Sequence, residues 1–146
     1  MAVIEGRTWL ELLSPPDCER LLRGQEVGRI AVLVDDHPEI FPLNYAVGDR
    51  CEIYFRCDRG TKLDALQEST TVCFEIDGLD EKQKIGWSVL VVGPVTHIRD
   101  PAKLAEIRRL PLQPWAAGEK ANVAKITPTK VTGRRIRRPA KGNVSD

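Results

Sequence analysis

Apolar and β-branched residues occur in short runs along the first part of the chain, and tight polar turns separate these runs. Residues 28–34 read GRIAVLV, residues 39–47 read EIFPLNYAV and residues 51–55 read CEIYF. The turns DDHP and GDR lie between them. Because strands joined by such short turns must be antiparallel, the pattern predicts three consecutive antiparallel strands. Pro42 favours an edge or bulge position in the second of them.

Three more strands are predicted further along the chain. Apolar and more polar positions alternate in residues 70–77, TTVCFEID, which is typical of a half-buried strand. Residues 85–98, IGWSVLVVGPVTHI, form a long and nearly continuous apolar run, which Gly93-Pro94 should bend. Residues 123–138, VAKITPTKVTGRRIRR, are predicted as one final strand with kinks at its proline and its glycine.

Helical signals are short and lie between these strands. Residues 14–24, SPPDCERLLRG, carry a capping Ser14 followed by proline, which suits the first helical position. Residues 61–69, TKLDALQES, are predicted as a short helix. Residues 100–110, DPAKLAEIRRL, are predicted as another helix, capped by Asp100. None of these segments is long enough to alternate with strands in a doubly wound sheet.

The order of elements therefore predicts a mainly β fold, a barrel of about six antiparallel strands with short helices inserted. Closing the sheet into a barrel removes its exposed edges. The length of 146 residues suits one domain, which we place at residues 1–138, with residues 139–146 as a disordered polar tail. No apolar run approaches the ~20 residues of a membrane helix. The four cysteines form no CxxC motif, which favours reduced thiols and a cytoplasmic location.

The charge of the chain is uneven. Residues 130–146 hold six lysines and arginines against one aspartate, whereas the rest of the chain carries a net negative charge. A basic tail can indicate binding to nucleic acid. No aromatic residues interleave with these cations, however, and the body is acidic. A solubilising tail, or a strand that ends over a phosphate, fits the pattern better than a nucleic-acid partner.

The segment RCDRGTK, residues 56–62, places three cations between a predicted strand and a predicted helix. Free backbone N–H groups at a helix N-terminus favour anions. Arg56 and Lys62 add charge, and Thr61 adds a hydroxyl. One interpretation is a phosphate site, and the other is a turn whose cations face water. The spacing alone does not separate the two.

Two other stretches offer ligand-binding groups. Asn44 lies inside a predicted strand, where an amide is unfavourable unless it is used. Trp87 and Ser88 begin the long apolar strand, which could line a flat ligand, although a plain core strand is the simpler interpretation. His37 and His97 complete no catalytic or metal-binding motif, so we assign no catalytic residue and no metal site. Any redox chemistry would come from a cofactor.

Three stretches taken in order carry a family resemblance: GRIAVLVDDHPEIFPLNYAV, IYFRCDRGTKLDAL and VCFEIDGLDEKQKIGWSVLVVGPV. This order resembles the pyridoxamine 5′-phosphate oxidase-like flavoproteins. More narrowly, it is similar to their short actinobacterial-type members and to the nitroimidazole-reductase group. The resemblance covers about residues 10 to 137. Its specific part runs from Gly28 to Gly93, with GTKL and GWSVLVVG as its strongest signatures.

The resemblance implies a split β-barrel that works as a homodimer, with flavin mononucleotide (FMN) in a groove between two subunits. A cation-rich turn would hold the phosphate, the second strand would run along the flavin ring, and the start of the fifth strand would approach the ring from the partner. Carried onto this chain, the implied cofactor-binding residues are Leu43, Asn44, Tyr45, Phe55, Arg56, Thr61, Lys62, Trp87 and Ser88.

The resemblance also implies an activity, that of an FMN-dependent oxidoreductase that moves a hydride between a reductant and a small-molecule substrate. The alternatives are a non-catalytic carrier of a flavin, a deazaflavin or haem, and a nucleic-acid-associated protein that uses the basic tail. The longer C-terminal segment with which the true oxidases bind the vitamin phosphate has no counterpart here. We therefore do not expect oxidation of pyridoxamine phosphate.

Overall fold

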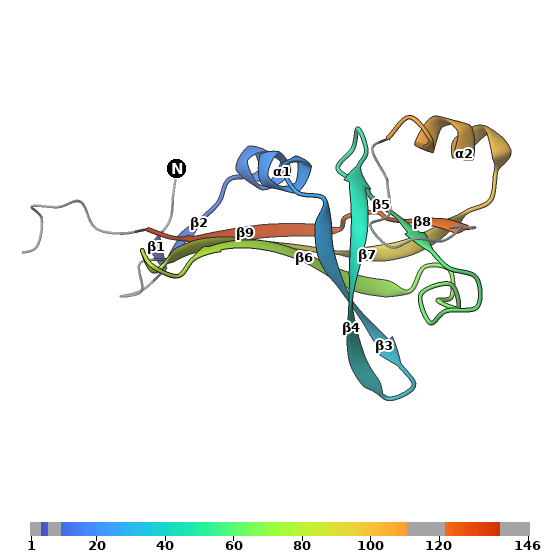
Figure 1. Cartoon of the computed structure of the whole chain (residues 1–146), viewed down its shortest axis with the longest axis horizontal. Coiled ribbons are helices and arrows are strands. Elements are labelled where there is room, and N and C mark those ends of the chain that lie inside the picture. The colour runs from blue at the N-terminus through green and yellow to red at the C-terminus, as the bar shows by residue number, and fades with distance from the viewer. Residues whose placement is uncertain (1–3, 6–9, 111–121, 138–146) are drawn as a thin grey trace, which may run out of the picture.

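The structure is a computed structural model that describes residues 4–5, 10–110 and 122–137. Within these residues it contains strands and two helices, arranged as shown in Figure 1. The strands are β1 (Ile4–Glu5), β2 (Leu10–Leu12), β3 (Val27–Val34), β4 (His37–Val47), β5 (Ile53–Cys57), β6 (Thr71–Asp80), β7 (Ile85–Ile98), β8 (Asn122–Ile126) and β9 (Lys130–Ile136). The helices are α1 (Pro15–Arg23) and α2 (Pro101–Ile107).

Six of the strands form a closed antiparallel barrel, as the sequence predicted. Its order is β7, β6, β3, β4, β5 and β8, and β8 pairs with β7 to close the ring. β9, β2 and β1 extend the sheet outward from β7. The β3–β4 hairpin extends away from the body at the bottom of Figure 1. Pro42 lies where β4 has a neighbour on one side only, because β5 pairs with β4 at residues 45–47 alone. This confirms its edge position.

β7 exchanges one partner for another halfway along its length. Its residues 86–92 pair with β9 and its residues 95–98 pair with β8. The exchange falls at Gly93-Pro94, where the sequence predicted a bend. A Cβ atom on Gly93 would lie 1.9 Å from the backbone oxygen of Thr127, so only glycine fits this crossing. The single final strand predicted for residues 123–138 is wrong, because the chain crosses β7 here and divides into β8 and β9.

The first helix begins and ends close to where the sequence indicates. Ser14 caps α1 by accepting a hydrogen bond from the Asp17 N–H at 3.3 Å, and Gly24 is its C-terminal cap. Cys18 and Leu22 on its inner face are buried. The second helix is also capped as predicted, by Asp100, but it ends at Ile107, before the predicted residue 110.

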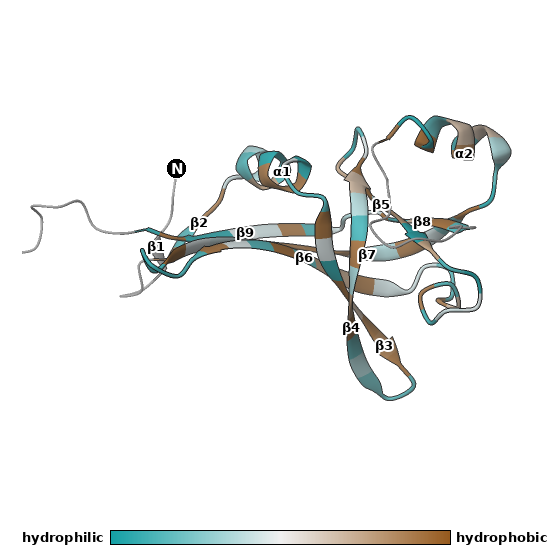
Figure 2. Cartoon of the chain, in the orientation of Figure 1, coloured by the Kyte–Doolittle hydropathy of each residue, from teal (hydrophilic) through white to brown (hydrophobic). Residues whose placement is uncertain are grey.

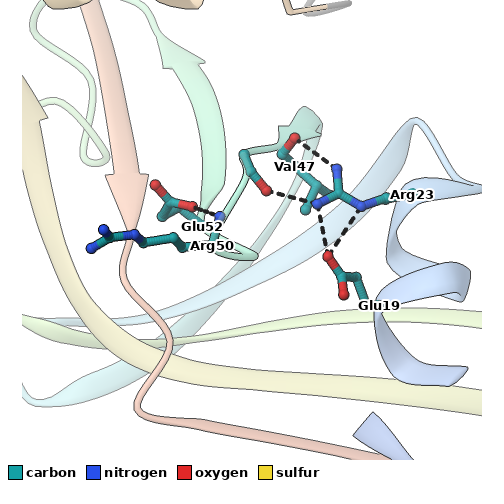
Figure 3. Close-up of polar contacts among 6 residues, drawn as sticks. Glu19, Arg23, Val47, Arg50 and Glu52 are labelled. Atoms are coloured by element: carbon teal, nitrogen blue, oxygen red, sulfur yellow. Dashed lines mark hydrogen bonds and ion pairs between the residues drawn. The ribbon is translucent and has the colours of Figure 1, made fainter. Parts of the chain in front are cut away.

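One arginine joins the C-terminal end of α1 to the end of β4 (Figure 3). The Arg23 Nη2 atom donates to the Gly48 carbonyl oxygen at 2.8 Å and to the Glu19 Oε1 atom at 2.8 Å. Its Nη1 atom donates to the Val47 carbonyl oxygen at 3.3 Å. The guanidinium group thus satisfies two backbone carbonyls at a strand end, and it fixes the helix against the barrel.

The helix predicted for residues 61–69 does not form, and that prediction is wrong. One i to i+4 hydrogen bond is present, from the Ala65 N–H to the Thr61 carbonyl oxygen at 3.0 Å, and turns follow. Asp64 folds back to accept from the Gly60 N–H at 2.9 Å, and Gly60 has a φ of 77°. These local hydrogen bonds of short polar side chains compete with continued helix formation. Only Leu63 and Leu66 offer an apolar face for packing.

The core fills the barrel with side chains from alternate strand positions. Figure 2 colours the ribbon by hydropathy, and brown segments recur along the barrel strands. Phe55, Phe74 and Ile30 are fully buried. The Phe74 ring meets the Tyr45 ring edge to face, with 4.8 Å between centroids. All four cysteines are free thiols. Neither described helix has the length and apolar character needed to cross a membrane.

Candidate functional site

Arg56 and Asn44 each lie one step beyond the end of the β4–β5 ladder. The ladder between these strands ends at Tyr45 and Phe55, whose side chains point inward and are buried. Side chains alternate along strands, so Asn44 and Arg56, one step further, share the outer face. The Arg56 Nε atom is buried and makes no hydrogen bond within the described residues. The Asn44 amide donates to the Glu26 carbonyl oxygen at 3.5 Å.

Lys62 lies against β4 and does not simply face water. Its Nζ atom is 2.6 Å from the Glu39 Oε1 atom. The pKa of Glu39 is lowered by the hydrogen bond from Lys62 first and by the bond to His37 second. The sequence could not indicate this partner, because 23 residues separate it from Lys62. An anion that binds Lys62 would have to share it with Glu39 or displace Glu39.

The backbone part of the predicted phosphate site is changed by the missing helix. Thr61 donates its hydroxyl hydrogen to the Asp58 carbonyl oxygen at 2.7 Å and accepts from the Asp64 N–H at 3.3 Å. The Thr61 N–H donates to the Asp58 carbonyl oxygen at 3.3 Å, and the Gly60 N–H is bonded to Asp64. A free helix N-terminus is therefore absent at this point. The remaining anion-binding groups of the prediction are the side chains of Arg56 and Lys62.

Three further predicted site residues have inward side chains. Leu43 and Tyr45 are 9% and 3% exposed, and Phe55 is fully buried. The Tyr45 hydroxyl donates to the Leu22 carbonyl oxygen at 2.5 Å, and burial raises the pKa of the Tyr45 phenol. Side chains in these positions support the core, so a ligand on the outer surface would not meet them directly. Their role in cofactor binding stays a prediction.

Trp87 and Ser88 lie near the opposite end of β7 from Arg56. Across β8, Arg56 lies opposite Val123, and Val123 lies opposite Ile98 of β7. Trp87 is at the other end of β7, about 35 Å along the strand from Ile98. Trp87 is half-buried and packs over Gly78, where an added Cβ would lie 2.6 Å from the indole Nε1 atom. Next to it is a pocket of about 340 Å³, lined by Gln25, Gly78, Leu79, Asp80, Ile85, Gly86, Trp87, Arg135 and Ile136. One copy of the chain thus does not bring the two halves of the predicted site together.

The structure also gathers three residues that the sequence did not associate. Cys57, Asp64 and His97 place a thiol, a carboxylate and an imidazole within 4.8 Å of one another. Burial raises the pKa of the Cys57 thiol to about 11. The three residues come from a strand end, a loop and another strand, so no short motif could reveal them.

Comparisons with known proteins agree with this fold. The pyridoxamine 5′-phosphate oxidase family matches residues 14–135. An uncharacterized protein of Mycobacterium tuberculosis is 33% identical over 129 residues, which cover 85% of this chain and 84% of that protein. The FAD binding protein from Mycobacterium smegmatis is 41% identical, with a TM-score of 0.76 over 88% of this chain and 99% of that one. This chain belongs to the pyridoxamine 5′-phosphate oxidase family.

The matched region holds the whole barrel of this family member, since it begins at the cap of α1 and ends within β9. A further solved structure, named as a 5-nitroimidazole antibiotic resistance protein from Bacteroides thetaiotaomicron, has a TM-score of 0.66 at 13% identity and covers 92% of each chain. At that identity the likeness concerns the fold alone. The oxidase family name describes ancestry and architecture, and the substrate has to be argued from this chain's own residues.

Proposed function

We propose that this chain binds a flavin nucleotide, with the phosphate beside Arg56 and Lys62, and works as a cytoplasmic oxidoreductase on a small molecule. The observation that carries the proposal is the buried Nε atom of Arg56, which lacks a hydrogen bond within the described residues. Leaving a buried donor unpaired is costly, and a bound phosphate oxygen would pair it. The 41% identical FAD binding protein supports a flavin as the class of ligand.

FMN is the flavin that the family resemblance implies, and Arg56 and Lys62 would suit its terminal phosphate. The arginine offers planar N–H donors and the lysine a compact charge. Each hydrogen bond to a charged group contributes about 1.5–3 kcal/mol. Flavin bound here would supply hydride transfer. The chain's own part would be to hold the phosphate, orient the ring along the β4 backbone and shield one face of it.

Replacing Lys62 with alanine is expected to weaken FMN binding about ten- to a hundred-fold, because one charge-assisted bond is lost. The affinity for riboflavin, which has no phosphate, should fall far less. Because Glu39 competes for Lys62, Glu39→Gln should tighten FMN binding several-fold. Flavin fluorescence titration measures all of these affinities. FAD is titrated in parallel, to separate the two nucleotides.

The matched control is Arg59→Ala, which removes a cation from the same loop at a position that the resemblance does not place on the ligand. Its FMN affinity should stay unchanged. Equal losses of affinity for FMN and for riboflavin in the Lys62 variant would mean that Lys62 acts on the fold or on the flavin ring. Unchanged affinity for both would show that the loop is a solvated turn.

A turnover assay distinguishes a catalytic flavoprotein from a flavin carrier. Reduction of the bound flavin by a nicotinamide cofactor, followed by reoxidation by a small acceptor, would support an oxidoreductase. A flavin that binds but does not turn over would support a carrier. The absorbance spectrum of the purified protein also distinguishes a flavin from a deazaflavin or haem.

We further propose that the working form is a homodimer. Within one chain, Arg56 approaches β7 through β8 near Ile98, whereas Trp87 and Ser88 lie at the other end of β7, so a second copy would join the two halves of the site. Leu79 and Ile136, beside the pocket, are 74% and 42% exposed and offer apolar surface for a partner. Sedimentation velocity at micromolar concentration should give a dimer, and a monomer there would contradict the proposal.

A further inference from the structure

A second cluster of polar groups lies at one end of the barrel, on the inward face of β5. Cys57 is the last residue of β5, and its side chain points to the opposite face from that of Arg56. Asp64 comes from the loop at residues 58–70, and His97 lies near the end of β7. One ligand atom from each lies within 4.8 Å of the other two. The chain thus places sulfur, oxygen and nitrogen donors together from three separate segments.

The imidazole of His97 is held in one orientation. Its Nε2 atom is 2.6 Å from the Leu66 carbonyl oxygen. A carbonyl oxygen only accepts hydrogen bonds, so Nε2 carries a hydrogen, and Nδ1 is the nitrogen that could bind a metal ion. Metal-binding histidines commonly donate their second N–H to a backbone carbonyl in this way. His97 therefore has the support that a metal ligand needs.

The carboxylate of Asp64 is also oriented by neighbours. Its Oδ1 atom accepts from the Asn122 Nδ2 atom at 2.5 Å, and its Oδ2 atom accepts from the Gly60 N–H at 2.9 Å. Each oxygen keeps a second lone pair, which is free for a metal ion. Asn122 is the first residue of β8, beside Cys57 in the ladder. The same contacts thus bring the loop, β5 and β8 together around Asp64.

We propose that Cys57, Asp64 and His97 bind one divalent transition-metal ion of the Zn²⁺ type. A thiolate, a carboxylate and a neutral imidazole are ligands of Zn²⁺, and the two negative charges balance those of the ion. Ligands at about 2.0–2.3 Å from Zn²⁺ lie about 3.5 Å apart. The three ligand atoms lie within 4.8 Å of one another, so the widest pair must close by up to about 1.3 Å. On binding, the Cys57 thiol proton passes to solvent. The fourth position is left for water.

The burial of the Cys57 side chain favours a role as a metal ligand over a role as a nucleophile. The same three residue types could form a thiol, base and carboxylate for covalent catalysis. Cys57 is only 3% exposed, however, and a nucleophile has to reach its substrate. A bound ion would fasten the loop of residues 58–70, which has one helical turn, to the ends of β5 and β7. This inference does not depend on flavin binding.

The test uses the untagged full chain, stripped with a chelator. Co²⁺ titration should give a thiolate-to-cobalt charge-transfer absorption that saturates at one equivalent, and Zn²⁺ should displace it. Cys57→Ser should abolish this absorption. His97→Gln should lower the affinity for Zn²⁺ about a hundred-fold or more. Competition with a chromophoric chelator measures this affinity. The matched control, Cys73→Ser on the outer face of β6, should behave like the wild type.

A second readout keeps the proposal testable if Cys57→Ser does not fold. Saturating Zn²⁺ should raise the Tm of the wild type and of Cys73→Ser but not that of His97→Gln. Asn122→Ala, which removes only the partner of Asp64, should lower Zn²⁺ affinity about 10–100-fold. Wild-type protein without one-equivalent binding would overturn the proposal. So would a cobalt–thiolate absorption that survives in Cys57→Ser, or Zn²⁺ affinity that is unchanged in His97→Gln.

Discussion

Replacing Gly93 with alanine is expected to lower the free energy of unfolding by about 3 kcal/mol. The new Cβ would lie 1.9 Å from the Thr127 carbonyl oxygen and 3.2 Å from the Pro128 Cα atom. These are backbone atoms, which cannot rotate away as a flexible side chain does. Moving the crossing segment would stretch the hydrogen bond from the Thr127 N–H to the Pro94 carbonyl oxygen, which is 3.1 Å long. Urea unfolding followed by tryptophan fluorescence measures the change.

Gly24→Ala is the matched control for this substitution. Gly24 has a φ of −88°, and the nearest atoms to an added Cβ are 3.5 Å away. Alanine fits there and restricts the unfolded chain, so stability should stay the same or rise by up to about 1 kcal/mol. If Gly93→Ala were as stable as Gly24→Ala, the β7 crossing would be looser than the structure indicates.

Replacing Phe74 with alanine should have a larger effect, a loss of about 3–5 kcal/mol in the free energy of unfolding. The Phe74 side chain is fully buried, and its ring packs edge to face on Tyr45. Truncation leaves a cavity between β3, β4 and β6 that the surrounding strands fill only in part. Chemical denaturation measures the loss. Cys73→Ala, on the outer face of the same strand, should cost much less.

The contact between Phe74 and Gly28 gives this prediction a more specific form. A Cβ on Gly28 would lie 2.3 Å from the Phe74 Cζ atom. Gly28→Ala should therefore destabilise the wild type more than it destabilises a Phe74→Leu background, since leucine leaves room for the methyl group. Additive effects of the two substitutions would show that the ring does not lie over Gly28.

The barrel strands could be predicted because each is an apolar run between polar turns. β7 was predicted with the bounds that the structure shows, 85–98, since its apolar run is long and has polar residues at both ends. The division of residues 123–138 into β8 and β9 could not be predicted. β-branched residues continue through Thr127 and Thr129, and the exchange of partner is decided by packing against β7 rather than by local pattern.

For the candidate site, charge and spacing indicate two cations, and whether these bind a ligand stays a prediction. Arg56 and Lys62 follow from charge and spacing. The structure pairs Arg56 with Val123 of β8 and places Lys62 against Glu39 of β4. Glu39 was missed because it is distant in sequence, and the helix at residues 61–69 was overpredicted because its capping residues bond within the turn instead. Whether the nine residues implied by the family resemblance contact a flavin stays a prediction for the titrations above.

The strand β8, which closes the barrel, also determines when the barrel can be completed during synthesis. β8 pairs with both β5 and β7, and it is the last of the six barrel strands along the chain. Until residue 126 has emerged from the ribosome, β5 and the far end of β7 each present an unpaired edge. Such edges pair readily with strands of other chains. A nascent chain that stalls before Asn122 is therefore expected to be the species that aggregates, even though most of its core residues have already been made.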